Sequence, residues 1–281
     1  MRVSLAQINS KLGDIKENIK IHKYYIEKGI ESKSNLIIFP ELSISGYYLL
    51  DGTLEVSLKK ENILEIFKEE SKKIDISIGF PELGDDKITY ISQIYLSKGE
   101  ILNVYRKIYP PNHGMFEDLK FFGRGKRVKA FETNYGKFGV LICRDFFHPS
   151  LPLLYYFQNI DLLILVSAIP VRGSYREEGL GIYESTEKLL SIYSQRFHFY
   201  VVFVNRVGFE DGIPFMGGSM AFDSSGRKIL SLPLIKESFE TIEIDFENIK
   251  RDIFNLPLKR EEDLNLILDN LKEIENGEFK N

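Results

Sequence analysis

The chain is organised around the stretch GVLICRDFFHP, residues 139–149, which holds the one cysteine among its 281 residues. A short apolar run leads into Cys143, and charged residues follow it at once. An uninterrupted apolar run bounded in this way predicts a buried strand. Because Pro149 can open a helix, the polar exit predicts a strand-to-helix turn. Cys143 is therefore expected at a strand end, where a thiol can meet a substrate. A lone cysteine is also commonly an inert core residue, and this stretch leaves both interpretations open.

The composition indicates a globular protein with a sizeable core, since 43% of the residues are hydrophobic and 13% aromatic. The net charge of −4, with both signs interspersed, argues against a nucleic-acid-binding surface. A single cysteine permits no intramolecular disulfide, which suits a reducing cytoplasm. The N-terminus lacks the features of a signal peptide, and no apolar run approaches the ~20 residues of a membrane span. We expect a cytoplasmic protein with neither nucleic acid nor membrane as a partner.

Outward from this stretch, apolar runs alternate with helical patterns. Strands are predicted at residues 3–8, 36–39, 74–80, 88–96, 101–105, 139–142, 162–166 and 200–205. Helices are predicted from Asp14 to about residue 30, then at about 54–73, 149–159 and 181–198. The period-two alternation of residues 74–80 predicts one buried face. Together these elements predict an α/β (α+β) fold with two sheets and helices on the outside.

The chain shows no repeat and no composition break before residue 250, so residues 1–250 are expected to form one domain. Residues 251–281 are charged, with leucines at 264, 268 and 271 on one face of a possible helix. This C-terminal extension is expected to pack on its own subunit or on a partner subunit.

Three predicted strands each end in an ionisable residue, namely Glu41, Lys107 and Cys143. Ligand sites in α/β sheets lie beyond strand ends, so these residues are expected to meet. A carboxylate can take the proton of a thiol, a thiolate can attack a carbonyl or nitrile carbon, and an ammonium can stabilise the oxyanion. Each residue alone has a plain structural interpretation, but the three together indicate thiol-dependent hydrolysis.

The sequence resembles the nitrilase (carbon–nitrogen hydrolase) superfamily over roughly residues 2 to 250. The matching blocks, in order, are FPEL 39–42 with Gly46-Tyr47, YRK 105–107, Pro111-Asn112, FFGRG 121–125, GVLICRD 139–145, NRVG 205–208 and GGS 217–219. The resemblance implies a four-layer αββα sandwich and a thioester intermediate. It further implies no metal, no organic cofactor, and a homodimer or larger homo-oligomer.

The resemblance also assigns roles: Cys143 as nucleophile, Glu41 as general base and Lys107 as oxyanion stabiliser. Substrate contacts are expected from Tyr47, Glu117, Arg144 and Ala168. Two positions depart from the family pattern. Many members carry a second glutamate after the lysine, and here both Glu117 and Asp118 could take that place. The residue after the nucleophile is Arg144, where relatives often have Glu, Trp, Tyr or Asp.

The resemblance favours an amidase that releases ammonia from a small carboxamide. A nitrilase or an N-carbamoyl amidase is the alternative, and a glutaminase-like partner that supplies ammonia to a separate synthetase is another. A papain-like pair of Cys143 with His113 or His148 is disfavoured, and no His or Cys pair has metal-ligand spacing. Arg144 and Arg172 together would favour neutral or anionic amides. Arg144 could equally pair with an acid such as Glu177 or Glu178 and never meet substrate.

Overall fold

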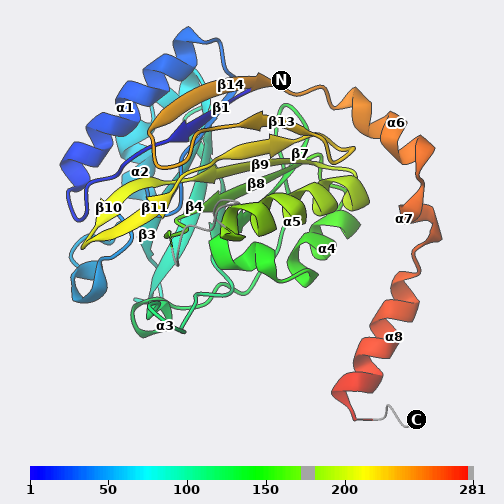
Figure 1. The fold of residues 1–281 in the computed structure, drawn as a ribbon. Coiled ribbons are helices and arrows are strands. Elements are labelled where there is room, and N and C mark those ends of the chain that lie inside the picture. Colours follow the sequence, from blue (N-terminus) through cyan, green and yellow to red (C-terminus); the bar gives the residue numbers. More distant parts are fainter. Residues whose placement is uncertain (172–180, 278–281) are drawn as a thin grey trace.

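The computed structural model describes residues 1–171 and 181–277, in which two six-stranded sheets lie face to face (Figure 1). The first sheet has the order β14 (Ser238–Glu243), β1 (Arg2–Gln7), β2 (Leu36–Ile38), β3 (Asp75–Leu83), β4 (Thr89–Ser97), β5 (Glu100–Arg106). The second has the order β13 (Lys228–Ser231), β12 (Met220–Phe222), β9 (Tyr200–Asn205), β8 (Leu162–Ser167), β7 (Lys137–Ile142), β6 (Phe131–Glu132). A separate hairpin joins β10 (Val207–Glu210) to β11 (Ile213–Met216).

Helices cover the outer face of each sheet, which confirms the predicted four-layer αββα sandwich. The first sheet is covered by α1 (Ile15–Glu31) and α2 (Lys60–Phe67), and the second by α4 (Ser150–Phe157) and α5 (Gly181–Phe197). The start of α1 is the expected one, since the Asp14 carboxylate accepts a hydrogen bond from the Glu17 N–H at 3.0 Å.

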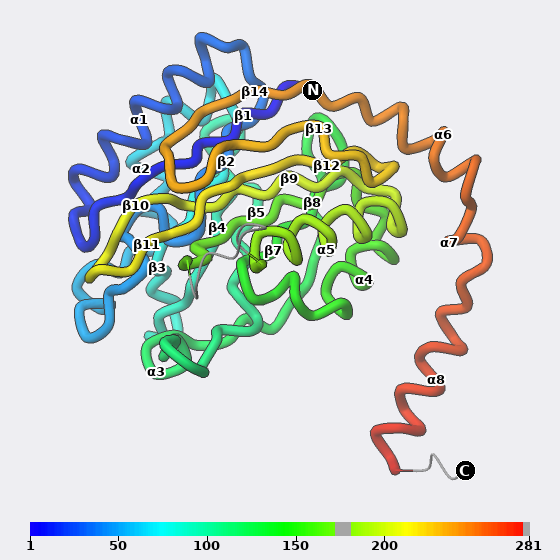
Figure 2. Tube along the Cα trace, in the orientation of Figure 1, coloured from blue at the N-terminus to red at the C-terminus, as the bar shows by residue number. Residues whose placement is uncertain are grey.

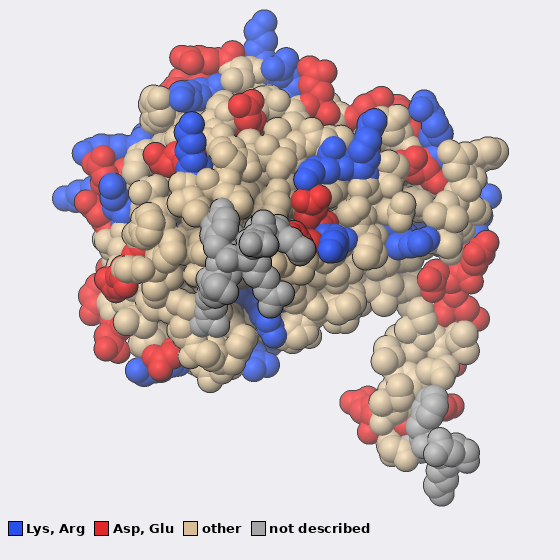
Figure 3. Space-filling model, in the orientation of Figure 1, with Lys and Arg blue, Asp and Glu red and all other residues tan. Residues whose placement is uncertain are grey.

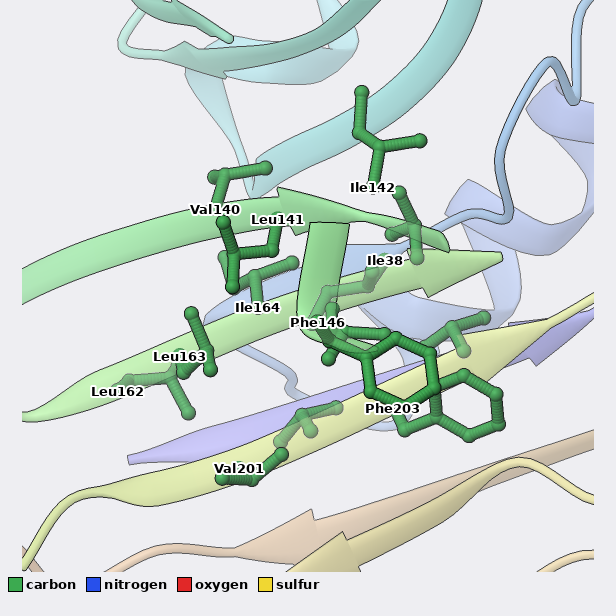
Figure 4. Packing of buried hydrophobic residues seen from close by; sticks show 14 of the residues in the cluster. Ile38, Val140, Leu141, Ile142, Phe146, Leu162, Leu163, Ile164, Val201 and Phe203 are labelled. Carbon is green, nitrogen blue, oxygen red and sulfur yellow. The ribbon is translucent and has the colours of Figure 1, made fainter. Parts of the chain in front are cut away.

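The middle of each sheet consists of three parallel strands, β1, β2 and β3 in one and β7, β8 and β9 in the other. Strands buried on both faces read as continuous apolar runs, which explains why β2, β7, β8 and β9 were predicted correctly. Figure 4 shows the packing where Phe146 lies against Phe203, with Ile38 nearby. The segments that build the site follow the carboxyl ends of β2, β7 and β8 and of the edge strand β5.

Two predicted elements are wrong in detail. The predicted helix over 54–73 is shorter, because α2 lies between short 3₁₀ turns at η1 (Leu50–Thr53) and η2 (Glu70–Lys72). Hydroxyl groups of Thr53 and Ser57 bond nearby backbone carbonyls and so compete with a regular helix. Strand β3 is buried on both faces rather than one. The polar residues of β3 have buried hydrogen-bond partners. For example, Ser77 Oγ accepts a hydrogen bond from Gln93 of β4 at 2.8 Å.

The C-terminal helices leave the sandwich after β14 and form an arm (Figure 2). The arm contains α6 (Glu247–Asn255), α7 (Leu258–Glu261) and α8 (Leu264–Glu275). Lys259 fastens it to the main body by donating a hydrogen bond to the Tyr156 carbonyl at 2.6 Å. No residue of α8 is buried. The domain boundary at residue 250 stays a prediction.

The charge distribution matches the sequence, since acidic and basic side chains alternate over the face drawn in Figure 3. Among the helices of residues 1–171 and 181–277, none combines the length and apolar character needed to cross a lipid bilayer.

Candidate active site

Cys143 lies at a strand-to-helix turn, as predicted. Strand β7 ends at Ile142, and the 3₁₀ turn η3 (Cys143–Phe147) begins with the cysteine. The backbone φ of Cys143 is +46°, a left-handed conformation that residues other than glycine adopt rarely and at an energetic cost. Only 9% of Cys143 is exposed, and that part borders a cavity. The sharp turn therefore holds the thiol at the edge of the core, facing a space that a ligand can enter.

Asp145 fixes this turn relative to the loop after β5. Its buried carboxylate accepts hydrogen bonds from the Tyr105 hydroxyl at 2.8 Å and from the N–H groups of Ile108 and Tyr109, the latter at 2.8 Å. Sequence reasoning missed this role. A carboxylate directly before Phe146 and Phe147, in the predicted turn, was the available signal, because a buried acid must find donors.

Glu41 follows β2 and is fully buried. Its Oε1 accepts a hydrogen bond from Lys107 Nζ at 2.7 Å, and its Oε2 accepts one from the Ala168 N–H at 2.9 Å. These contacts join both sheets, because Ala168 follows β8 of the second sheet. The carboxylate is therefore held by donors on both of its oxygens.

Lys107 follows β5, and its side chain has no exposed surface. Besides Glu41, its Nζ lies 3.3 Å from Oδ2 of Asp118. Burial alone lowers the pKa of Lys107, but the attraction of Glu41 and Asp118 outweighs it and raises the pKa above its usual value. The side chain is therefore an ammonium ion with carboxylates on two sides.

Asp118, not Glu117, reaches this group of charges. Asp118 is 7% exposed and accepts a hydrogen bond from the Tyr47 hydroxyl at 2.9 Å. The Glu117 side chain is 59% exposed and lies 4.0 Å from Lys120. Of the two acids that fit the family's second glutamate, Asp118 is thus the one that contacts Lys107, and Glu117 lies away from it.

Burial dominates the pKa values of the thiol and the carboxylate. Burial, assisted by the charge of Glu41, raises the pKa of Cys143 to about 12, although Lys107 acts in the opposite direction. Burial also raises the pKa of Glu41 against the opposing effect of Lys107. Glu41 and Cys143 each influence the pKa of the other, as expected for two groups of one buried site. The site thus contains a protonated thiol beside a potential base.

The cavity in front of Cys143 has a volume of about 250 Å³. Its lining is largely apolar, with Pro111, His113, Phe116, Cys143, Arg144, Phe147, Ile169, Pro170 and Ile182. This volume lies below the ~300–1,000 Å³ common for ligand pockets, so it suits a small molecule. Arg144 lines it, with its guanidinium carbon 5.7 Å from the Phe147 ring centroid.

The remaining predicted site residues are placed as follows. Tyr47 is buried and bonds Asp118, and Ala168 uses its N–H for Glu41. Their contacts with substrate stay predictions. Arg172, Glu177 and Glu178 lie outside the described residues. The ring of His148 packs at a tilt against that of Tyr109, with centroids 4.0 Å apart, and His113 lines the cavity. Within the described ranges, no three His, Cys, Asp or Glu side chains are grouped to hold a metal ion.

This fold and this site agree with the comparison to known families, since the carbon-nitrogen hydrolase family model matches residues 2–253. The chain belongs to the carbon–nitrogen hydrolase family, which confirms the resemblance. Its similarity to a solved carbon-nitrogen hydrolase from Helicobacter pylori supports the fold, with a TM-score of 0.88 and 21% identity over 96% of this chain and 98% of that one.

Among curated proteins, the chain is 31% identical over 255 residues to the glutamine-dependent NAD(+) synthetase of Thermotoga maritima. The match covers 89% of this chain but 43% of the synthetase, so the chain spans under half the length of that relative. It is 29% identical to a probable nitrilase of Schizosaccharomyces pombe, covering 88% of this chain and 90% of that protein. This domain therefore occurs both in a relative more than twice as long and in one of similar length.

Proposed function

We propose that the chain hydrolyses the carbon–nitrogen bond of a small carboxamide and releases ammonia through a thioester on Cys143. The observation that carries this proposal is the buried contact of Glu41 with Lys107 beside the thiol. With a pKa of about 12, the thiol is protonated at neutral pH. A base must therefore take its proton as the sulfur attacks, and Glu41 is the neighbouring carboxylate.

In the first half of the reaction, Glu41 takes the thiol proton while the sulfur bonds to the amide carbon. A protonated Glu41 no longer neutralises Lys107, so the ammonium can stabilise the negative charge that develops on the amide oxygen. The proton then passes from Glu41 to the leaving nitrogen, the carbon–nitrogen bond breaks, and ammonia departs. Cys143 is left as a thioester.

In the second half, Glu41 takes a proton from water and the resulting hydroxide attacks the thioester carbon. The carbon–sulfur bond breaks, the carboxylic acid product leaves, and the sulfur regains its proton from Glu41. The overall change is the conversion of amide and water into acid and ammonia. Each step uses groups of the chain itself.

The test is ammonia release across a panel of ω-amides, N-carbamoyl amines and nitriles. Turnover of an amide, loss of turnover in Cys143→Ala, and an acyl adduct on Cys143 by mass spectrometry are expected. Alkylation of Cys143 by iodoacetamide should be stoichiometric, abolish turnover, and be slowed by substrate. A preference for nitriles or N-carbamoyl compounds would reassign the substrate, and full activity in Cys143→Ala would refute the mechanism.

A second candidate is a glutaminase that supplies ammonia to a separate synthetase. Its support is the match to part of a synthetase whose name states its dependence on glutamine. Glutamine should then be hydrolysed with a higher kcat/KM than butyramide, which has the same amide chain but lacks the α-amino and α-carboxylate groups. An equal or lower value would favour the simple amidase.

A further inference from the structure

A buried ion pair connects the β10–β11 hairpin to the segment that follows Glu41. The side chains of Arg206 and Glu210 are each 1% exposed and form a direct salt bridge. Arg206 Nη2 also donates to the Ser10 carbonyl at 3.1 Å, and its guanidinium carbon lies 4.2 Å from the Phe215 ring centroid. Burying two charges is costly unless further contacts compensate, so the other partners of Glu210 indicate what the pair holds.

Those partners are backbone N–H groups of the segment after β2. Tyr47 N donates to both Glu210 oxygens, at 3.2 and 3.0 Å, and Tyr48 N donates to Oε2 at 2.9 Å. Gly46 has a φ of +81°, and a Cβ there would lie 2.6 Å from Glu210 Oε1. A side chain at position 46 would thus both strain the backbone and displace the carboxylate. The segment is fitted closely around Glu210.

The side chain of Tyr47 carries this constraint to the charged group at the site. Its hydroxyl donates to Asp118 at 2.9 Å, and Asp118 lies 3.3 Å from Lys107 Nζ. The Tyr47 ring centroid also lies 5.8 Å from the same Nζ. A continuous series of contacts therefore runs from Glu210 through Tyr47 and Asp118 to Lys107.

We propose that Glu210 is a positioning residue for hydrolysis: it holds Tyr47 so that the tyrosine hydroxyl fixes Asp118 against Lys107. The inference rests on the proposed function, because hydrolysis is its main readout. A carboxylate suits this task because it accepts from two successive N–H groups while the contact with Arg206 orients it. A residue that only stabilised the hairpin would affect stability without acting through the Tyr47 hydroxyl.

The test is a double-mutant cycle on kcat with Glu210→Gln and Tyr47→Phe. Displacement of a site by about 1 Å can cost ~10²-fold, so Glu210→Gln should lower kcat at least tenfold. Because the effect passes through Tyr47, the same substitution in a Tyr47→Phe background should lower kcat less than threefold further. Multiplicative losses, or a kcat unchanged by Glu210→Gln, would overturn the proposal. Glu210→Asp, which keeps the charge, serves the same cycle if Glu210→Gln does not fold.

The control is Asp75→Asn. Asp75 begins β3, at the end of the strand away from the site, and its buried carboxylate accepts a hydrogen bond from the Tyr95 hydroxyl. Asp75→Asn should lower Tm without the kcat loss seen for Glu210→Gln. A second readout needs no substrate: the rate of Cys143 alkylation against pH should change in Glu210→Gln and stay at wild type in Asp75→Asn. If wild type hydrolyses no amide, the proposed function fails, and this alkylation profile alone decides the positioning role. An unchanged profile would then refute it.

Discussion

Nζ of Lys107 lies 2.7 Å from Oε1 of Glu41, and neither side chain has any exposed surface. Such a pair is held in place by its surroundings, because a buried charge without a partner is costly. Two donors on the two oxygens of Glu41 leave the carboxylate little freedom to turn. The thiol therefore has a base with a fixed orientation.

Replacing either member of this pair should abolish most turnover while the protein still folds. Glu41→Gln keeps an acceptor for Lys107 but cannot take a proton, and loss of a general base costs ~10²–10⁴ in rate. Lys107→Ala removes the oxyanion donor, which costs ~10²–10³. Circular dichroism should show folded proteins, and ammonia release gives the rates. A loss below tenfold for either variant would mean that the roles are misassigned.

The neighbouring acids Asp118 and Glu117 provide a matched comparison. Asp118→Asn removes the negative charge 3.3 Å from Lys107, whereas Glu117→Gln removes one from an exposed side chain. A charged hydrogen bond contributes ~1.5–3 kcal/mol, so Asp118→Asn should lower kcat/KM by about tenfold or more. Glu117→Gln should change it less than threefold. Equal losses in the two variants would contradict the assignment of Asp118.

These two acids also show where sequence reasoning reached its limit. The apolar runs of β2, β8 and β9 predicted strands correctly, and the positions after the strands predicted Glu41, Lys107 and Cys143 as neighbours. Which acid turns inward depends on the loop path, set by contacts such as Asp118 N–H to the Pro111 carbonyl at 3.0 Å. Adjacent positions in a loop without periodicity carry no such information.

Polar contacts between residues far apart in the chain could not be predicted from the sequence either. Glu210 binds the Tyr47 N–H across 163 positions in the chain. A local pattern cannot reveal a backbone donor as the partner of an acid. The one-sided burial expected for β3 failed for a related reason: its polar residues have hydrogen-bond partners that only the tertiary structure supplies.

Stability should depend on pH through His22. This buried side chain contacts the Asn18 carbonyl at 2.7 Å and Ser43 Oγ at 2.9 Å. Burial lowers its pKa from 6.5 to about 4, against the opposing effect of the Asn18 contact. Between these values the unfolded chain binds a proton that the folded chain does not. The free energy of unfolding should therefore fall as pH drops below 6.5, by up to about 1.4 kcal/mol per pH unit.

The measurement is urea unfolding of wild type and His22→Gln between pH 4 and 7. The difference in unfolding free energy between the two should shrink as the pH falls, because only the wild type carries this imidazole. His113→Gln, in the loop after β5, is the control and should keep the wild-type pH dependence. Parallel curves for wild type and His22→Gln would show that the imidazole is not excluded from water in the folded protein.

The arm should mediate self-association. Helix α8 exposes Leu264, Leu268, Leu271 and Ile274 by 44–59%, and their spacing puts them on one face. We propose that this face packs on a second copy, so light scattering should give a dimer or larger assembly. Leu268→Asp with Leu271→Asp should lower the mass, whereas Asn265→Asp should not. A fully active wild-type monomer at micromolar concentration would indicate that the arm serves its own subunit.

Through Arg144, kcat/KM should depend on the charge of the substrate. Arg144 lines the cavity beside Cys143, and no ion pair holds its guanidinium among residues 1–171 and 181–277. A guanidinium attracts a carboxylate and repels an ammonium. We therefore expect a higher kcat/KM for an amide with a terminal carboxylate than for a matched amide with a terminal amine.

Arg144→Ala should remove this preference and cost the anionic amide ~1.5–3 kcal/mol more than the cationic one, the scale of a charged hydrogen bond. Arg124→Ala is the matched control, because Arg124 lines a different cavity with Arg106 and Lys126. The same charge is removed there, so any long-range effect of net charge would appear in both variants. Equal losses for the two substrates in Arg144→Ala would make Arg144 a structural residue, paired with an acid rather than with the substrate.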